Sequence, residues 1–244
     1  MTVRLCRTRI DCFRADGSLM DLAAPMAEEV SFSVMAARLS RIARFNGTPH
    51  GGYSVAQHCV MGAQAILNEG GDELLAALFL LHDGHESFVG DKTRPVQSLE
   101  RTAIRMAAGE EAAAAYDRVH RAIRDGWDWA IYTAAGLPVP AAWTKQMRTT
   151  VAAMDERMLH AEAVALFGSN GAAWASSALR PLLATPKLTG AIRPWGAMKA
   201  EEAFVAMFDR LLGYERRMET SAVHAAHVAL TEGATAEFRE GKGK

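Results

Sequence analysis

The sequence predicts an all-α protein with a short β-hairpin near its start. Half of the 244 residues are hydrophobic, which is enough apolar side chain to build a full core. Alanine, leucine and methionine are plentiful while β-branched residues are comparatively few, a composition that favours helix. Apolar positions also return at helical spacing in most of the longer segments. The length suits one medium-sized domain.

The charge balance indicates what the protein does not bind. The formal net charge is −1 with neutral histidines, whereas a protein that coats a nucleic acid usually carries a large basic excess. We therefore expect no nucleic-acid polymer as a partner. A small anionic substrate remains compatible with this balance, because it needs only a local cluster of arginine and lysine.

Cysteine usage and hydropathy indicate the compartment. The sequence has three cysteines, Cys6, Cys12 and Cys59, an odd number whose spacing matches no zinc or redox motif. We interpret Cys59 as a small buried apolar residue. The longest apolar run, residues 74–81, is too short to span a bilayer. No apolar signal-peptide core follows the first arginines. We expect a cytoplasmic protein with reduced thiols and no membrane partner.

The first elements are expected to be irregular. Over residues 1–29, a loose alternation followed by a turn signal at 15–18 indicates a short hairpin. Residues 31–44 show helical spacing. The segment 46–52 contains Gly and Pro and should then break the chain.

Two further helices should follow in close succession. Ser54 is a suitable N-cap for the first, and two consecutive glycines after residue 68 would end it. Asp72 can cap the second helix, which should continue through His82 and Asp83 up to the helix-ending Gly90.

The rest of the chain is predicted to be mostly helical. Residues 169–194 are rich in Gly, Ser, Thr and Pro, so they should form a long loop with short helical pieces. One domain is expected over residues 1–215, followed by a C-terminal helix and frayed tail over 216–244. The amphipathic start of that tail offers a surface for a homo-oligomer, a dimer or larger. Helices before it are expected over residues 98–108, 110–133, 141–167 and 197–213.

An adjacent His82 and Asp83 lie at the end of the apolar run. Removing both groups from water is costly unless something compensates them. A divalent metal ion compensates both, because imidazole donates a lone pair and the carboxylate cancels charge. Glu86, four residues after His82, would share its face on a continuous helix. A His-Asp pair taken alone more often caps or pairs locally, so the context decides.

Two more residues supply that context. His58 is predicted on the preceding helix, and two helices joined by a short turn pack antiparallel, so His58 and His82 can converge. Asp155 is the acid that interrupts the mostly apolar face of residues 151–158. It would complete a set of two histidines and two aspartates, although a lone acid there is usually part of a salt bridge.

The order His, then His-Asp, then Asp on successive helices resembles the signature of HD-domain metal-dependent phosphohydrolases. Finer motifs resemble the YfbR-like 5′-deoxynucleotidase branch, which includes phage-borne deoxyadenosine triphosphate triphosphohydrolases. The resemblance covers roughly residues 5–213 and implies a helical bundle of the HD-domain type. The motifs are Arg44-Phe45-Asn46-Gly47, Tyr53-Ser54-Val55-Ala56-Gln57-His58, His82-Asp83-x-x-Glu86, Gly90-Asp91, Gly17-Ser18-Leu19-Met20-Asp21-Leu22 and Ile192-Arg193-Pro194-Trp195.

The resemblance implies a set of metal ligands. His58, His82, Asp83 and Asp155 would hold one divalent ion, namely Mn²⁺, Co²⁺, Mg²⁺, Fe²⁺ or Zn²⁺. Four protein ligands on an octahedral ion leave two positions for water and a phosphate oxygen. Mixed nitrogen and oxygen donors suit manganese, cobalt, iron or magnesium better than a structural zinc site.

The resemblance also implies the catalytic groups. Glu86 and Asp91 match the carboxylates of the family, of which one would orient the attacking water and the other would protonate the leaving oxygen. Arg44 matches a basic residue that contacts the substrate phosphate, for which a guanidinium is well shaped.

The sequence departs from the family pattern in segments that are expected to face the substrate. Gln97 stands where a lysine is common, so Lys92 or Arg94 are candidates to supply that charge. The stretch between Asp83 and Asp155 is also long, which indicates an elaborated substrate-facing segment.

Weaker candidates have ordinary explanations as well. His85 could touch substrate or stay at the periphery, and His50 could reach the phosphate or remain an exposed loop histidine. Phe45 or Tyr53 could stack on a base, although core packing explains each of them equally well. Trp127 and Trp129 are expected in packing or in an oligomer contact, and His224 and His227 as an exposed pair on the last helix.

The functional prediction is therefore a metal-dependent enzyme that removes the 5′-phosphate or the triphosphate from (deoxy)nucleotides. Attack of a metal-activated water would break the phosphoester. The alternative is a non-catalytic nucleotide-sensing module of the same fold that keeps the metal for structure. The carboxylates Glu86 and Asp91 argue against this alternative, because a structural site needs neither.

Overall fold

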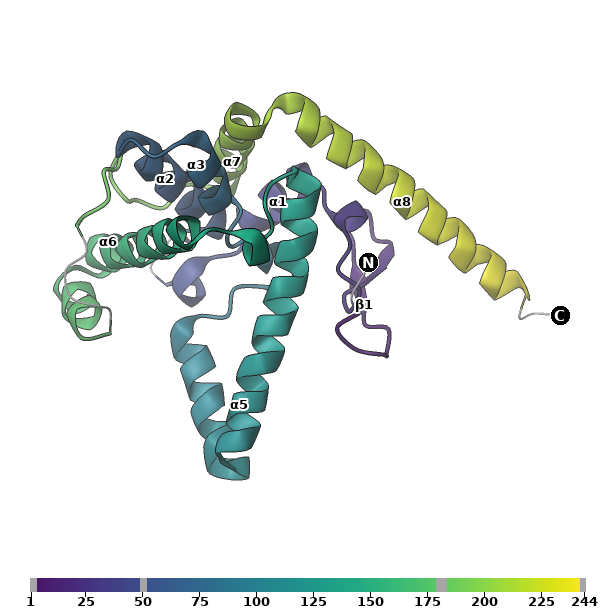
Figure 1. Ribbon diagram of the computed structural model, residues 1–244, viewed down its shortest axis with the longest axis horizontal. Coiled ribbons are helices and arrows are strands. Elements are labelled where there is room, and N and C mark those ends of the chain that lie inside the picture. The colour runs from purple at the N-terminus through teal and green to yellow at the C-terminus, as the bar shows by residue number, and fades with distance from the viewer. Residues whose placement is uncertain (1–3, 49–51, 179–183, 242–244) are drawn as a thin grey trace.

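The computed structural model describes residues 4–48, 52–178 and 184–241, and it is all-α with one small hairpin (Figure 1). Within these residues the only strands are β1 (Asp11–Phe13) and β2 (Leu19–Asp21), which pair antiparallel. The predicted fold class and its hairpin are confirmed. No helix in this part of the chain is long and apolar enough to cross a membrane.

Four helices form the body of the protein. They are α1 (Phe32–Leu39), α2 (Val55–Asn68), α3 (Glu73–Leu80) and α7 (Ala197–Leu212). α2 lies beside α3, and α7 contacts all three of the others (Figure 1). The core between them and the neighbouring helices includes the fully buried Phe32, Tyr53, Phe79, Trp127, Tyr132, Phe204 and Phe208.

Side-chain caps fix where three of these helices begin. Ser31, Ser54 and Asp72 each accept a hydrogen bond from the backbone N–H three residues later, at 3.5, 3.2 and 2.7 Å. Each bond satisfies an amide that has no partner inside its helix. The predicted caps at Ser54 and Asp72 are confirmed, and the first of them places His58 within the opening turn of α2.

A glycine lets α2 and α3 approach each other closely. A Cβ atom at Gly62 would lie 2.1 Å from Cε1 of Phe79, so any other residue there would collide with that ring. The ring of Phe79 lies 5.6 Å from the His58 ring and 4.3 Å from the His82 ring, measured between centroids. The close approach therefore brings the two predicted ligand histidines together.

The predicted helix up to Gly90 is interrupted at the His-Asp pair. α3 ends at Leu80, turns follow, and α4 (Glu86–Val89) begins after them. Adjacent residues of an α-helix point about 100° apart, so a continuous helix would not aim His82 and Asp83 at one point. The turn does so, and the expectation that His82 and the first residue of α4 share a helix face was wrong.

The helix predicted over residues 31–44 is also shorter than expected. α1 ends at Leu39, and the chain becomes extended before the 3₁₀ turn η2 (Arg44–Gly47). Ala43 pairs with Ser54 as an isolated antiparallel bridge, and the Arg44 N–H donates to the Tyr53 carbonyl at 2.8 Å. These bonds to the start of α2 replace further helical turns and carry Arg44 toward His58.

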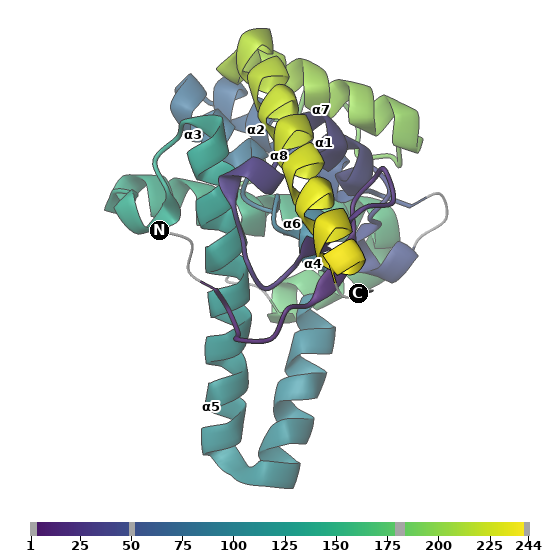
Figure 2. The ribbon, with the colours of Figure 1, turned by 90° about the vertical axis from the view of Figure 1, so that its right-hand side faces the viewer.

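α5 (Arg94–Ala135) is a helical hairpin that projects from the body as an arm (Figures 1 and 2). Gly109, with φ 85° and ψ 175°, divides it into two halves that match the helices predicted on either side of residue 109. Arg101 ties the halves together through ion pairs of 2.5 and 2.9 Å to Glu110 and Asp117. The base of the second half enters the body.

α6 (Lys145–Ala178) follows the short turn η3 (Pro140–Ala142) and runs beyond its predicted end. Gly168, with φ 59° and ψ −133°, breaks it, and a helical segment continues to residue 178. This segment is one of the short helical pieces predicted within 169–194, and Ala175 packs it back on the preceding helix. Residues 179–183 of that prediction lie outside the described part of the chain. Residues 184–196 have no helix or strand, as predicted.

α8 (Tyr214–Gly241) packs first on α7 and on the turn η1 (Ala27–Glu29), then leaves the body (Figures 1 and 2). His227 Nε2 lies 3.1 Å from Glu29 Oε1, and His224 Nδ1 lies 3.2 Å from the Glu28 carbonyl. Both histidines are only half-exposed. The prediction of an exposed pair was wrong because η1 covers this part of α8.

Candidate metal centre

Four side chains from three elements converge beside Phe79. They are His58 of α2, His82 and Asp83 of the turn after α3, and Asp155 of α6. His58 Nε2 lies 3.4 Å from His82 Nε2, 3.4 Å from Asp155 Oδ1 and 3.7 Å from Asp83 Oδ2. His82 Nε2 lies 3.3 Å from Asp83 Oδ2 and 3.8 Å from Asp155 Oδ1. The predicted convergence of these four residues is confirmed.

The other ring nitrogens fix the tautomers of the two histidines. His82 Nδ1 lies 2.7 Å from the Phe79 carbonyl oxygen, and His58 Nδ1 lies 2.6 Å from Glu162 Oε1. Both partners accept hydrogen bonds, so each Nδ1 carries a hydrogen. In a neutral ring, each Nε2 then carries a lone pair, which faces the other Nε2 and two carboxylate oxygens.

The donor set fits one divalent cation. Nitrogen and oxygen ligands lie about 2.0–2.2 Å from such an ion, so neighbouring ligands are roughly 3.0 Å apart in an octahedron and 3.5 Å in a tetrahedron. The measured separations of 3.3–3.8 Å lie close to these values. Without a cation, protons would have to lie between these lone pairs, because lone pairs that face one another repel. The cluster of His58, His82 and Asp155 can therefore hold a metal ion, and Asp83 stands beside it.

The charges of the cluster shift its pKa values in opposite directions. Burial lowers the pKa of His82, but the Asp83 carboxylate and a hydrogen bond to Asp155 outweigh it and hold that pKa well above the ordinary value. Burial raises the pKa of Asp155, but hydrogen bonds from His58 and His82 hold it well below the usual range. A metal ion must therefore displace protons from the histidines.

Glu162 contacts the cluster, although the sequence did not single it out as a site residue. Its side chain is completely buried on α6, with Oε1 against His58 and Oε2 accepting from Arg44 Nε at 3.1 Å. It lies seven residues after Asp155, two helical turns along the same face. That spacing is the signal that could have revealed it.

Arg44 reaches the centre, as the resemblance implied. Its Nη1 lies 3.4 Å from Asp83 Oδ2, and its side chain is 12% exposed. The adjacent Phe45 and Asn46 have φ of 55° and 53°, in a left-handed region that Asn adopts comparatively often but Phe rarely. Strain of this kind is often stored at functional sites. The Phe45 ring packs edge-on against Phe167 at 5.2 Å between centroids.

Of the two predicted catalytic carboxyls, Glu86 lies beside Asp83, and Asp91 is close enough to interact with the charges of Asp83 and His58. Glu86 Oε2 is buried and has no hydrogen-bond partner among the described residues. Burial and then the nearby Asp83 and Asp91 raise the pKa of Glu86 well above its usual range. Burial also raises the pKa of Asp91, against the attraction of Arg44. Both carboxyls therefore hold their protons more tightly than exposed ones.

His85 is anchored by a second acid that the sequence reasoning missed. Its Nδ1 lies 2.9 Å from Oδ1 of Asp128, a buried residue at the base of the arm. Ligand atoms of His85, Asp83 and Glu86 all lie within 4.8 Å of one another, so His85 faces the same space. The sequence signal that could have revealed Asp128 is its position between two tryptophans in an otherwise apolar stretch.

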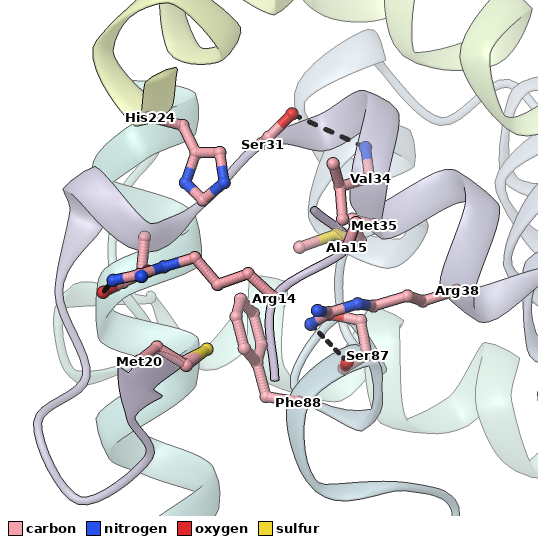
Figure 3. Close-up of a pocket in the computed structure, with 11 residues that line it drawn as sticks. Arg14, Ala15, Met20, Ser31, Val34, Met35, Arg38, Ser87, Phe88 and His224 are labelled. Atoms are coloured by element: carbon pink, nitrogen blue, oxygen red, sulfur yellow. Dashed lines mark hydrogen bonds and ion pairs between the residues drawn. The ribbon is translucent and has the colours of Figure 1, made fainter. Parts of the chain in front are cut away.

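Packing holds α4 in place from both sides. Phe88 stacks on Trp127 with ring centroids 3.8 Å apart, and Arg38 of α1 donates to the Ser87 carbonyl at 3.3 Å (Figure 3). Trp127 is therefore a core residue, whereas Trp129 is 37% exposed. These contacts fix the helix that begins with Glu86.

The two basic residues that follow Asp91, Lys92 and Arg94, lie in different parts of the structure. Arg94 Nη2 lies 3.2 Å from Asp155 Oδ2, at the rim of the centre. Lys92 points to the arm instead, where its Nζ lies 3.0 Å from Glu100 Oε2 and 3.3 Å from His120 Nε2. The structure therefore brings Arg94 but not Lys92 to the cluster.

Of the remaining candidates, two are buried in the core and one lies outside the described residues. Tyr53 and Cys59 are completely buried, and the Cys59 Sγ lies within 4.8 Å of ligand atoms of His82 and Asp83. His50 belongs to residues 49–51, which lie outside the described part of the chain.

No family model matches the chain, and a search of curated proteins finds no match either. The resemblance to HD-domain phosphohydrolases therefore stays a prediction that rests on the motifs.

Proposed function

We propose that the protein is a divalent-metal-dependent phosphohydrolase that removes the 5′-phosphate or the triphosphate from (deoxy)nucleotides. The observation that carries this proposal is that the Nε2 atoms of His58 and His82, 3.4 Å apart, each lie 3.3–3.8 Å from a carboxylate oxygen of Asp83 and of Asp155, beside a buried Glu86 oxygen that has no partner among the described residues. A site that only holds a metal for structure does not need a spare buried carboxyl. The nucleotide as substrate comes from the resemblance.

His58, His82, Asp83 and Asp155 would hold the ion. When bound, it would lower the pKa of a coordinated water and polarise the phosphoryl group. The chain's own contribution begins with orientation. Glu162 and the Phe79 carbonyl fix the two imidazoles, so that both Nε2 lone pairs point inward.

Glu86 and Asp91 would handle the protons. One accepts a proton from the attacking water as its oxygen bonds to phosphorus, and the other donates a proton to the leaving oxygen as the phosphorus–oxygen bond breaks. Carboxyls with raised pKa values suit these tasks, because they exchange protons closer to neutral pH than exposed ones.

Arg44 and Arg94 would bind the phosphate. Arg44 lies within the cluster and Arg94 at its rim, and a guanidinium presents paired donors to phosphate oxygens. Phe45, beside Arg44 and in a strained conformation, is the candidate for contact with the base. His85, held by Asp128, is a further candidate for contact with the phosphate.

The test is release of phosphate, triphosphate and nucleoside from a panel of ribo- and deoxynucleoside mono- and triphosphates. Each reaction is run with Mn²⁺, Co²⁺ or Mg²⁺ and with a chelator. Chelator-sensitive release from monophosphates identifies a 5′-nucleotidase, and release confined to a triphosphate identifies a triphosphohydrolase. Absence of turnover with every metal contradicts the proposal and favours a nucleotide-sensing module.

Three further expectations belong to the same proposal. They are a cytoplasmic location, a homo-oligomer that uses the last helix, and one catalytic domain over residues 1–215. Size-exclusion chromatography with light scattering, on the full chain and on a chain that ends at residue 215, tests the second and third.

A further inference from the structure

We infer that Glu162 is a positioning residue that makes metal binding and phosphate binding at this centre depend on each other. The inference deepens the proposed function and rests on it, because it assigns the coupling of the two ligands to one side chain. Glu162 would touch neither ligand. It would act through His58 on the metal and through Arg44 on the phosphate.

The carboxylate of Glu162 contacts both of these partners, and the Tyr53 side chain also interacts with it. Its Oε1 lies 2.6 Å from His58 Nδ1, and its Oε2 lies 3.1 Å from Arg44 Nε. The side chains of Glu162 and His58 are completely buried, and that of Arg44 is 12% exposed. One carboxylate thus joins a predicted metal ligand to a predicted phosphate-binding cation, without water between them.

On the metal side, the carboxylate orients His58. It accepts the Nδ1 hydrogen, so Nε2 is the lone pair that faces His82 and Asp155. A carboxylate behind a ligand histidine also raises the basicity of that ligand. Loss of such a partner typically lowers metal affinity about 10–100-fold.

On the phosphate side, the carboxylate restrains Arg44. It holds Nε, while Nη1 makes only a long contact of 3.4 Å to Asp83 Oδ2. Nη2 makes no hydrogen bond to any residue that the structure describes, so it remains free to donate to an anion. Without Glu162, this guanidinium would still be attracted by Asp83, whose Oδ2 lies 3.4 Å from Nη1, and by Asp155. Arg44 would then compete with the cation for the metal ligands.

The coupling follows from this geometry. A cation at the cluster engages Asp83 and so releases Nη1 of Arg44 for phosphate, while Glu162 keeps the guanidinium in place. Phosphate should therefore tighten metal binding, and by linkage the metal should tighten phosphate binding by the same factor. A residue with only a structural role would affect folding and leave this factor unchanged.

The experiment is calorimetric titration of the full chain with Mn²⁺, with and without inorganic phosphate, corrected by a protein-free titration. In the wild type, phosphate should raise the Mn²⁺ affinity at least about 5-fold, the lower end of typical coupling. Glu162→Gln should weaken Mn²⁺ binding about 10–100-fold and abolish the phosphate effect. Glu156→Gln removes the same charge from the same helix and should behave as wild type.

A second variant decides the matter if Glu162→Gln does not fold. Arg44→Met leaves the His58–Glu162 contact intact, so Mn²⁺ affinity without phosphate should stay within a few-fold of wild type. The phosphate effect should disappear. A wild-type phosphate effect in Arg44→Met, or wild-type Mn²⁺ affinity in folded Glu162→Gln, would overturn the inference.

The results also separate this inference from the proposed function. Cooperative Mn²⁺ and phosphate binding that depends on Glu162, without turnover of any nucleotide, supports the inference and contradicts the enzyme. Nucleotide turnover in a protein whose Glu162→Gln variant binds Mn²⁺ as the wild type does contradicts the inference alone.

Discussion

The protein buries charges in two places, and the two differ in how completely those charges are paired. Behind the hairpin, Arg14 donates to both oxygens of Glu29 at 2.8 and 2.6 Å, and to Ser18 and the Leu19 carbonyl. Its surroundings leave a cavity of about 10 Å³, room for one water molecule (Figure 3). Each nitrogen of this guanidinium has at least one acceptor.

The candidate metal centre is the opposite case. Lone pairs of His58, His82, Asp83 and Asp155 face one another, and Glu86 Oε2 has no partner among the described residues. A buried polar atom without a partner is costly, so a structure that only had to be stable would not favour this arrangement. The paired Arg14–Glu29 cluster is expected to serve folding, and the incompletely paired centre is expected to serve function.

The largest expected effect comes from Glu86→Gln on turnover. Loss of a carboxyl that moves a proton typically lowers the rate about 10²–10⁴-fold. Metal affinity should stay within a few-fold of wild type, because Glu86 is not one of the four ligands. Steady-state kinetics and Mn²⁺ titration of the same preparation measure both. Unchanged turnover would remove Glu86 from the proposed mechanism.

The paired cluster should respond in the opposite way to the matching change. Glu29→Gln leaves the Arg14 charge buried without its counter-ion, which should lower the free energy of unfolding by about 3–5 kcal/mol. Mn²⁺ affinity of the folded variant should not change. Urea unfolding measures the first quantity, with exposed Glu219→Gln as the control. A loss below 1 kcal/mol would show that the pairing contributes little.

The same ion pair predicts a dependence of stability on pH. Burial raises the pKa of Glu29, but hydrogen bonds and charge from Arg14 outweigh it and lower the pKa in the folded state. The contribution to stability is therefore full above the unfolded pKa and is lost as pH falls through the folded one. In urea unfolding between pH 7 and pH 3, the wild type should lose more stability than Glu29→Gln. Parallel curves for the two proteins would contradict the assignment.

The smallest effect is expected from Glu86→Gln on the free energy of unfolding. Burial and neighbouring acids raise the pKa of Glu86, so its ionised form destabilises the metal-free protein above the unfolded pKa. Glu86→Gln should therefore raise the free energy of unfolding by about 0.5–2 kcal/mol at pH 7, with the gain shrinking at lower pH. Urea unfolding in chelator measures it. A clear loss of stability would show that Glu86 has a structural role.

Much of the fold and centre could be predicted because their signals are local or sequential. Caps such as Ser54 and Asp72 are readable from a few residues, and two helices joined by a short turn brought His58 beside His82. Gly62 then sets how close they come. The break before α4 was missed because aiming two adjacent side chains at one point is a tertiary requirement.

The partners of the ligands could not be predicted in the same way. Glu162 faces His58 only because α6 packs against α2 and η2, and Asp128 meets His85 only because the arm returns to the body. Lys92 turns away from the centre for the same reason, since Glu100 and His120 of the arm surround it. Such contacts depend on where distant elements cross, which spacing alone does not reveal.

If the converging cluster is one divalent-metal centre, the purified protein should retain a metal ion there. The most direct measurement is elemental analysis of the metal bound after dialysis against Mn²⁺ or Co²⁺, for wild type, His82→Ala and Glu86→Gln. We predict one ion per chain in the wild type and in Glu86→Gln, and loss of that ion in His82→Ala. A wild type that retains no metal, or a His82→Ala variant that retains it fully, would contradict the account.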